Sequence, residues 1–278
     1  GVGMLFAPKS GEELRKDLEF LTKQSLIIRT DINTCSKEER QLLPRTCEIR
    51  NIDEAIDRRI AGPAKKGSAM SEKERRAVAY HEAGHAIIGL RLENSDKVQK
   101  ITIVPRGRTG GHVLMTPEDD RFLMTEKELK SRIAGYLGGR TSEEIFFGDV
   151  STGASNDIEV ATRIARSMVT EYGMSSLGLV QYEKDNSSVF LGRDYTSTQK
   201  NFSTQVAFEI DTEVRRIIDE AHKIATDIIT QNKDDVILIA ETLLEQETIT
   251  AEEINYLLEH RSLEGFGKIE TPSEQENK

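Results

Sequence analysis

The sequence lacks tryptophan, has only two cysteines and contains no long apolar run. The two cysteines, Cys35 and Cys47, form no C-x-x-C pair, so no disulfide framework is expected, which fits a reducing compartment. No run approaches the roughly 18–20 apolar residues that span a bilayer, and no secretory signal is recognisable. We therefore expect no transmembrane segment in this chain. Because 31% of the residues are charged, a helix-rich, water-facing protein is expected.

Basic residues are outnumbered, with 38 Lys and Arg against 48 Asp and Glu and a net charge of −10. Nucleic-acid binding needs basic patches, so we expect no nucleic-acid partner. The phosphate-binding pattern G-x-x-x-x-G-K-[ST] is also missing, so we expect no ATP site and no ATPase activity from this chain. The first residue is Gly1 rather than Met, which suggests a fragment or a processed product.

Histidine is scarce, with five among 278 residues, yet two of them stand in the pattern H-E-x-x-H formed by His81, Glu82 and His85. Chance would give this pattern on the order of once per hundred such chains. Residues four apart on a helix share a face, so both imidazoles can bind one ion. Glu82 can then act as the general base for a water held at that ion. The pattern indicates a hydrolytic zinc site.

The chain is expected to be mainly α-helical, with a small β-hairpin and a helical C-terminal region. The helix that carries the H-E-x-x-H pattern has a capping box at its start, formed by Ser71 and Glu74. A glycine pair, Gly138-Gly139, is expected to end the helix that follows the hairpin. We expect helices over residues 72–92, 125–137, 157–171, 203–230, 235–247 and 250–260, and a hairpin from residues 98–104 and 112–115.

A catalytic zinc ion requires a third protein ligand, and the two common spacings for it fail. Six residues beyond His85 the chain has Arg91 instead of histidine, and residues 103–110 contain no acid. The remaining histidines are interpreted as ordinary surface or packing residues; they are His112, His222 and His260.

Three acidic residues remain as candidates for the third ligand. Asp157 follows a loop of small residues and starts a helix, whose positive end favours a carboxylate; the alternative is that it only caps that helix. Glu143 and Glu144 are its rivals, or they orient a ligating histidine through its other ring nitrogen. Periodicity does not choose among the three.

Several separated motifs, in this order, resemble the peptidase domain of the FtsH family of membrane-anchored, ATP-dependent zinc metalloproteases. In that family the two histidines of H-E-x-x-H and the aspartate of an Asn-Asp pair bind zinc, which the resemblance carries over to His81, His85 and Asp157. It also implies that Glu143 does not bind zinc itself but supports one of the zinc ligands. The stretches that carry it are residues 78–86, 137–140 with 143–144, 151–157, 168–175 and 189–194, together with the expected helices beyond Ser203.

The resemblance implies a zinc endopeptidase acting on unfolded or membrane-derived proteins, with Glu82 as the general base. The alternative is an inactive or regulatory subunit that assembles with full-length FtsH-type proteases. The resemblance also implies a homo-oligomer or an assembly with FtsH-type subunits, in either case a hexamer, and a place at the cytoplasmic side of the cell membrane. We expect the hairpin edge to hold extended substrate by strand addition; its residues are Gly110, Gly111, His112, Val113, Leu114 and Met115.

The domain organisation that we expect has four parts. Residues 1–48 form an irregular N-terminal segment, interpreted as an anchor remnant. Residues 49–63 resemble the last helix of an AAA ATPase lid, although the rest of that ATPase module is absent from the sequence. The peptidase domain occupies residues 64–262, and residues 263–278 form a disordered tail.

Overall fold

The computed structural model describes residues 58, 62, 70–106, 109–117, 123–183 and 202–266. The expected N-terminal segment and nearly all of the expected lid helix lie outside these residues, as do residues 267–278 of the expected tail. By its contacts the chain divides into two units, and nearly all of the described residues belong to the larger one, residues 68–105 and 109–278. All of the helices and strands in the described residues from 70 onwards belong to this larger unit.

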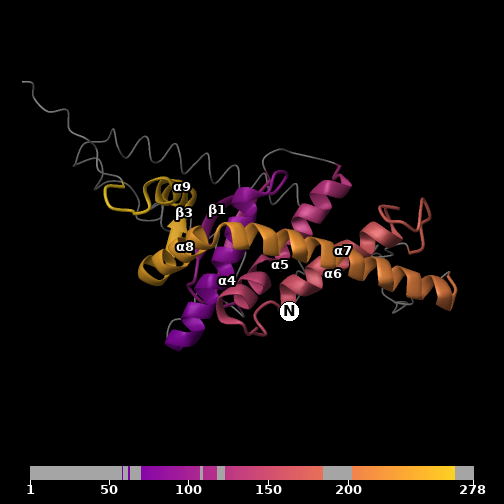
Figure 1. The fold of residues 1–278 in the computed structure, drawn as a ribbon, viewed down its shortest axis with the longest axis horizontal. Coiled ribbons are helices and arrows are strands. Elements are labelled where there is room, and N and C mark those ends of the chain that lie inside the picture. The colour runs from indigo at the N-terminus through magenta and orange to yellow at the C-terminus, as the bar shows by residue number, and fades with distance from the viewer. Residues whose placement is uncertain are drawn as a thin grey trace, which may run out of the picture. The chain divides into compact units, whose positions relative to one another are not determined.

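This unit is mainly α-helical with one small antiparallel sheet, as expected from the sequence. Figure 1 shows α7 as a long helix that runs past α6, α5 and α4 towards α8. None of the helices in the described ranges is long and apolar enough to cross a membrane. The elements are α4 (Glu72–Arg91), β1 (Lys97–Thr102), β2 (His112–Thr116), α5 (Glu126–Phe147), α6 (Ser155–Thr170), α7 (Thr204–Gln231), α8 (Lys233–Gln246), β3 (Thr248–Thr250) and α9 (Ala251–His260).

Helix α4 lies at the centre of the unit. Its capping box is formed as expected: the Ser71 side chain accepts from the backbone of Glu74, and the Glu74 side chain accepts from the backbone of Ser71. Ten consecutive residues, Ala79–Ile88, are buried, so this part of the helix is covered on every side. Residues from α5, α7, α8 and both hairpin strands contact it.

The predicted end of α5 at Gly138-Gly139 is wrong, because α5 continues to Phe147 and ends at Gly148. The glycines serve packing instead. A Cβ on Gly84 would lie 2.5 Å from the carbonyl oxygen of Gly138, and a Cβ on Gly138 would lie 2.8 Å from that of Gly84. Glycines at both positions therefore let the backbones of α4 and α5 touch.

The sheet has the order β2-β1-β3. The β1–β2 hairpin was expected from alternating residues, and it contains a register shift between Val98 and Lys100. Strand β3 was not expected. It pairs with β1 so that Ile101 and Ile249, both fully buried, face each other. This leaves β2 at an edge of the sheet in the described part of the chain.

Candidate metal centre

The two histidines of the H-E-x-x-H pattern meet the aspartate at the start of α6. The Nε2 atoms of His81 and His85 are 3.1 Å apart. The Oδ2 atom of Asp157 lies 3.4 Å from the first Nε2 atom and 3.6 Å from the second. In the described part of the chain these three residues form the group whose ligand atoms could hold a metal ion.

Both histidines are held by their other ring nitrogen. His81 Nδ1 lies 2.7 Å from Glu143 Oε1, and His85 Nδ1 lies 2.8 Å from the carbonyl oxygen of Gly135. A carbonyl and an ionised carboxylate only accept hydrogen bonds, so each Nδ1 carries the proton. In the neutral rings the Nε2 lone pairs then point at each other and at Asp157. Such convergent acceptors need a positive charge between them.

The separations fit zinc. With zinc–ligand bonds of about 2.05 Å, two ligands of a tetrahedral site lie about 3.3 Å apart. The three separations in the structure, 3.1, 3.4 and 3.6 Å, lie on either side of that value. If all three residues bound the ion, one position of a tetrahedral site would stay open, as in catalytic zinc sites.

The electrostatics of the cluster favour a cation. Burial opposes a charge on His81, but the carboxylates of Asp157 and Glu143 outweigh burial and raise its pKa to about 10. Burial also opposes the charge on Asp157, but the two histidines hold its pKa well below its usual range. A proton and a metal ion compete for the same place in such a site. The field that stabilises the imidazolium would therefore also stabilise Zn²⁺.

Glu82 is 7% exposed and lies beside the cluster. Burial raises its pKa, and the nearby His85 and His81 partly oppose that rise. Its side chain also lies against the residue that precedes β2, since a Cβ on Gly111 would be 3.0 Å from Glu82 Oε1. A buried carboxylate beside a candidate metal site and a strand edge is suited to accept a proton from water.

The rival acids are separated by the structure. Glu143 reaches His81, whereas Glu144 points to α7 and lies 2.8 Å from His222 Nε2. The last histidine, His260, stacks on Tyr256 with ring centroids 4.0 Å apart. The sequence could not separate neighbouring glutamates, because the choice depends on how α5 crosses α4.

Two residues that hold the cluster in place were not predicted from the sequence. One is Gly135, whose carbonyl holds His85. The other is Ser151, whose backbone N–H donates to Glu143 Oε2 over 2.6 Å and whose hydroxyl donates to Glu143 Oε1 over 2.9 Å. A serine in a loop of small residues just before Asp157 was a visible signal. A backbone carbonyl leaves none.

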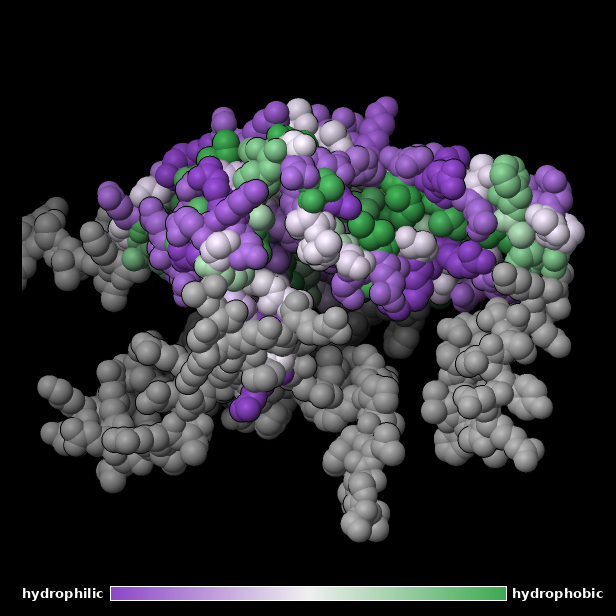
Figure 2. Space-filling model, turned by 90° about the horizontal axis from the view of Figure 1, so that it is seen from below, coloured by the Kyte–Doolittle hydropathy of each residue, from purple (hydrophilic) through white to green (hydrophobic). Residues whose placement is uncertain are grey.

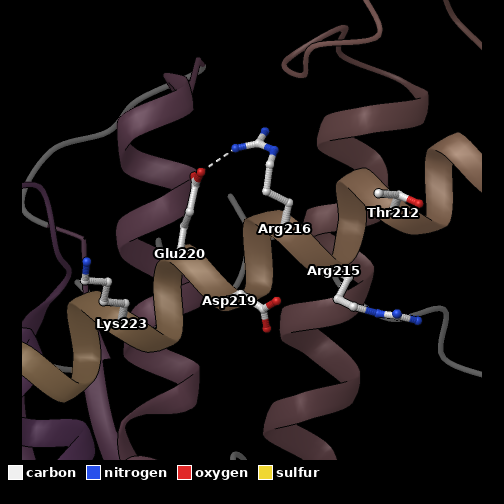
Figure 3. A pocket seen from close by; sticks show the side chains of 6 residues that line it. All are labelled: Thr212, Arg215, Arg216, Asp219, Glu220 and Lys223. Atoms are coloured by element: carbon white, nitrogen blue, oxygen red, sulfur yellow. Dashed lines mark hydrogen bonds and ion pairs between the residues drawn. The ribbon is translucent and has the colours of Figure 1, made fainter.

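A surface hollow lies elsewhere, along one face of α7. Figure 3 shows its side chains projecting from successive turns of that helix, with Arg216 donating to Glu220. All of its lining residues belong to α7, and they include none of the cluster. We interpret it as an ordinary charged helix surface.

The helical fold and the His-His-Asp cluster define a zinc-binding domain of the H-E-x-x-H type. Residues 68–257 match the profile of Peptidase family M41, and the chain belongs to this family. It is 54% identical over 218 residues to the ATP-dependent zinc metalloprotease FtsH of Bacillus subtilis, covering 78% of this chain and 34% of that protein.

Proteins of the same name in two other organisms are also similar to this chain. The one from Mesomycoplasma conjunctivae is 57% identical over 210 residues, which are 75% of this chain and 28% of that protein. The one from Acholeplasma laidlawii is 48% identical over 239 residues, which are 86% of this chain and 36% of that protein. The chain thus spans about a third of the length of these relatives. Family and cluster together give zinc as the cofactor.

Proposed function

We propose that this chain is a zinc-dependent endopeptidase that cleaves unfolded or membrane-derived polypeptides. The observation that carries the proposal is the convergence of three acceptor atoms, from His81, His85 and Asp157, beside the buried Glu82. In this proposal the three residues are the zinc ligands and Glu82 is the general base. Membership of Peptidase family M41 supports the same reaction class.

The roles of the side chains follow from their contacts. Zinc, when bound, supplies a Lewis acid that makes water acidic and polarises the substrate carbonyl. Glu82 accepts the proton of the attacking water and then delivers it to the leaving amine. Its raised pKa brings it closer to the working pH of such a base. Glu143 and the Gly135 carbonyl hold both Nδ1 protons, which keeps both Nε2 lone pairs directed at the cation.

We also propose that substrate adds as a strand along residues 110–115. Two observations support this. Strand β2 is an edge of the sheet in the described ranges, and Gly111, just before it, lies against the side chain of Glu82. A peptide paired with this edge would have its backbone close to the proposed base.

The relatives are named ATP-dependent, and the chain shares about a third of their length. We propose that it works with FtsH-type subunits, in a hexamer at the cytoplasmic side of the cell membrane. We further propose that residues 64–262 are its peptidase domain and that residues 49–63, which precede it in the sequence, are a lid remnant. In this arrangement the chain cleaves and other subunits supply the unfolding.

The test compares Glu82→Gln with the wild-type chain in an ATP-free assay on unfolded casein, together with zinc analysis. We expect the variant to keep zinc but to lose cleavage by about 10²- to 10⁴-fold, since general-base catalysis contributes that much. Glu144→Gln is the matched control and should remain active. Retained cleavage in Glu82→Gln would remove Glu82 from this role. Zinc without cleavage in the wild-type chain would favour the regulatory alternative.

A further inference from the structure

Ser151 connects the two parts of the proposed metal centre, which are the two histidines and Asp157. The histidines come from α4, whereas Asp157 comes from the first turn of α6. Glu143, on α5, touches the histidine side through a 2.7 Å contact with His81 Nδ1. Ser151 belongs to the short segment that leads from α5 into α6 and hence to Asp157.

Both oxygens of Glu143 are held by this serine. The backbone N–H of Ser151 donates to Oε2 over 2.6 Å, and its hydroxyl donates to Oε1 over 2.9 Å. Oε1 is also the atom that accepts from His81. One carboxylate oxygen therefore joins the ring of a proposed ligand to the hydroxyl of Ser151.

The same hydroxyl also organises the segment that follows it. Ser151 Oγ accepts from the backbone N–H of Gly153 over 3.1 Å. This contact matters because α6 begins at Ser155 and its N-cap residue, Ala154, supplies no side-chain hydrogen bond to the start of the helix. The start of α6, and with it the position of Asp157, depends on how residues 151–153 are held.

We propose that Ser151 is a positioning residue that couples the segment carrying Asp157 to the carboxylate that orients His81. It touches neither substrate nor metal and acts through Glu143. This inference rests on the proposed function, in which His81 and Asp157 bind the same zinc ion. Partners behind metal ligands typically change metal affinity by about 10- to 100-fold when they are removed.

The experiment measures Zn²⁺ affinity of the full chain by competition with a chelator. Ser151→Ala should weaken Zn²⁺ binding about 10-fold. Ser151→Thr keeps the hydroxyl at an exposed position and should bind close to the wild-type value. Thr152→Ala, at the exposed neighbouring position, is the matched control and should leave the affinity unchanged. Thermal melting of the metal-free variants should show intact folding.

A double-mutant cycle separates coupling from simple stiffening of the segment. If Ser151 acts through Glu143, Ser151→Ala should have little further effect on Zn²⁺ affinity in a Glu143→Ala background. Additive losses, or an unchanged affinity in Ser151→Ala, would overturn the inference. A wild-type chain that takes up no Zn²⁺ would overturn the proposed function and this inference with it, so the two failures are distinguishable.

Discussion

The region around the cluster and the C-terminal helices bury different kinds of side chain. In α4 and α5 the buried set includes His81, Glu82, His85, Ser142 and Glu143. In α7 it is mostly apolar and recurs at helical spacing, with Ile210, Ile217, Ala221, Ala225 and Ile229 buried. Figure 2 shows a mainly hydrophilic face with a smaller gathering of hydrophobic side chains.

The difference lies in what each region needs to stay folded. Buried polar groups are costly unless each has a partner. In the cluster region buried polar groups have specific partners. The hydroxyl of Ser142 donates to the Tyr80 carbonyl over 2.6 Å, and Glu143 accepts hydrogen bonds from His81 and Ser151. The apolar stripe of α7 is non-directional and tolerates small shifts. We therefore expect substitutions that remove a single polar atom to have large effects in the cluster region. Substitutions in the apolar stripe of α7 should have smaller, graded effects on stability.

The largest expected effect is on zinc binding in Asp157→Ala. This change removes one of three acceptors, so the affinity for Zn²⁺ should fall by more than about 100-fold, beyond the loss expected for a supporting partner. Zinc content and chelator competition measure it. Glu144→Ala, which removes the contact with His222, should retain zinc. Zinc retained in Asp157→Ala but lost in Glu144→Ala would reverse the assignment of the third ligand.

A smaller effect is expected from two glycine-to-alanine changes in α5. A Cβ on Gly139 would lie 2.4 Å from His81 Nε2, whereas a Cβ on Gly135 would meet nothing within 4 Å. Gly139→Ala should lower the free energy of unfolding by about 1–3 kcal/mol through overpacking and should weaken zinc binding. Gly135→Ala should instead raise the free energy of unfolding by about 0.5–1 kcal/mol, because alanine is the better helix former.

Urea denaturation of the two variants, each with and without Zn²⁺, makes the comparison. They differ by the same single methyl group on the same helix, so intrinsic helix propensity cancels between them. If both variants gained stability, the close approach of α5 to His81 would be wrong. The specific packing of the cluster region would then have to be argued from its hydrogen bonds alone.

Local patterns predicted much of the described fold. A capping box located the start of α4, and it is formed in the structure. The structure also has capping boxes at the starts of α5 and α9, whose positions the sequence predicted closely. Alternating residues located the β1–β2 hairpin. These features depend on residues close together in the sequence, which explains why they were visible. Strand β3 was missed because three residues, Thr248–Thr250, are too few to show a period and become a strand by pairing with β1.

The glycine pair shows where local reasoning failed. Gly138-Gly139 is a reasonable helix end in isolation, because glycine is a poor helix former. In the folded chain these positions face Gly84 and His81, where a side chain does not fit. The same crossing of α4 and α5 decides that Glu143, and not Glu144, reaches the cluster. How α4 and α5 pack against each other cannot be predicted from the residue pattern of either helix alone.

The smallest expected effect tests the C-terminal region through pH. The side chain of Glu213 on α7 accepts from Arg216, which together with the Ser176 N–H lowers its pKa to about 2, despite partial burial that opposes this. A carboxyl group with a lowered pKa in the folded state stabilises the fold above its unfolded value of 4.5, and this contribution is lost as the pH falls towards 2.

The free energy of unfolding of the metal-free protein should therefore fall between about pH 4.5 and 2. In Glu213→Gln it should fall by about 1 kcal/mol less over that window. The difference is modest because Arg216 is partly exposed, so solvent screens the pair. Urea denaturation at pH 6 and pH 3 measures the difference. Glu209→Gln on the same helix, where Glu209 accepts from Gln205, should follow the wild-type curve. If all three curves run parallel, the Glu213–Arg216 pair contributes nothing measurable. The stability of α7 would then rest on its apolar stripe alone, which would make the contrast with the cluster region sharper.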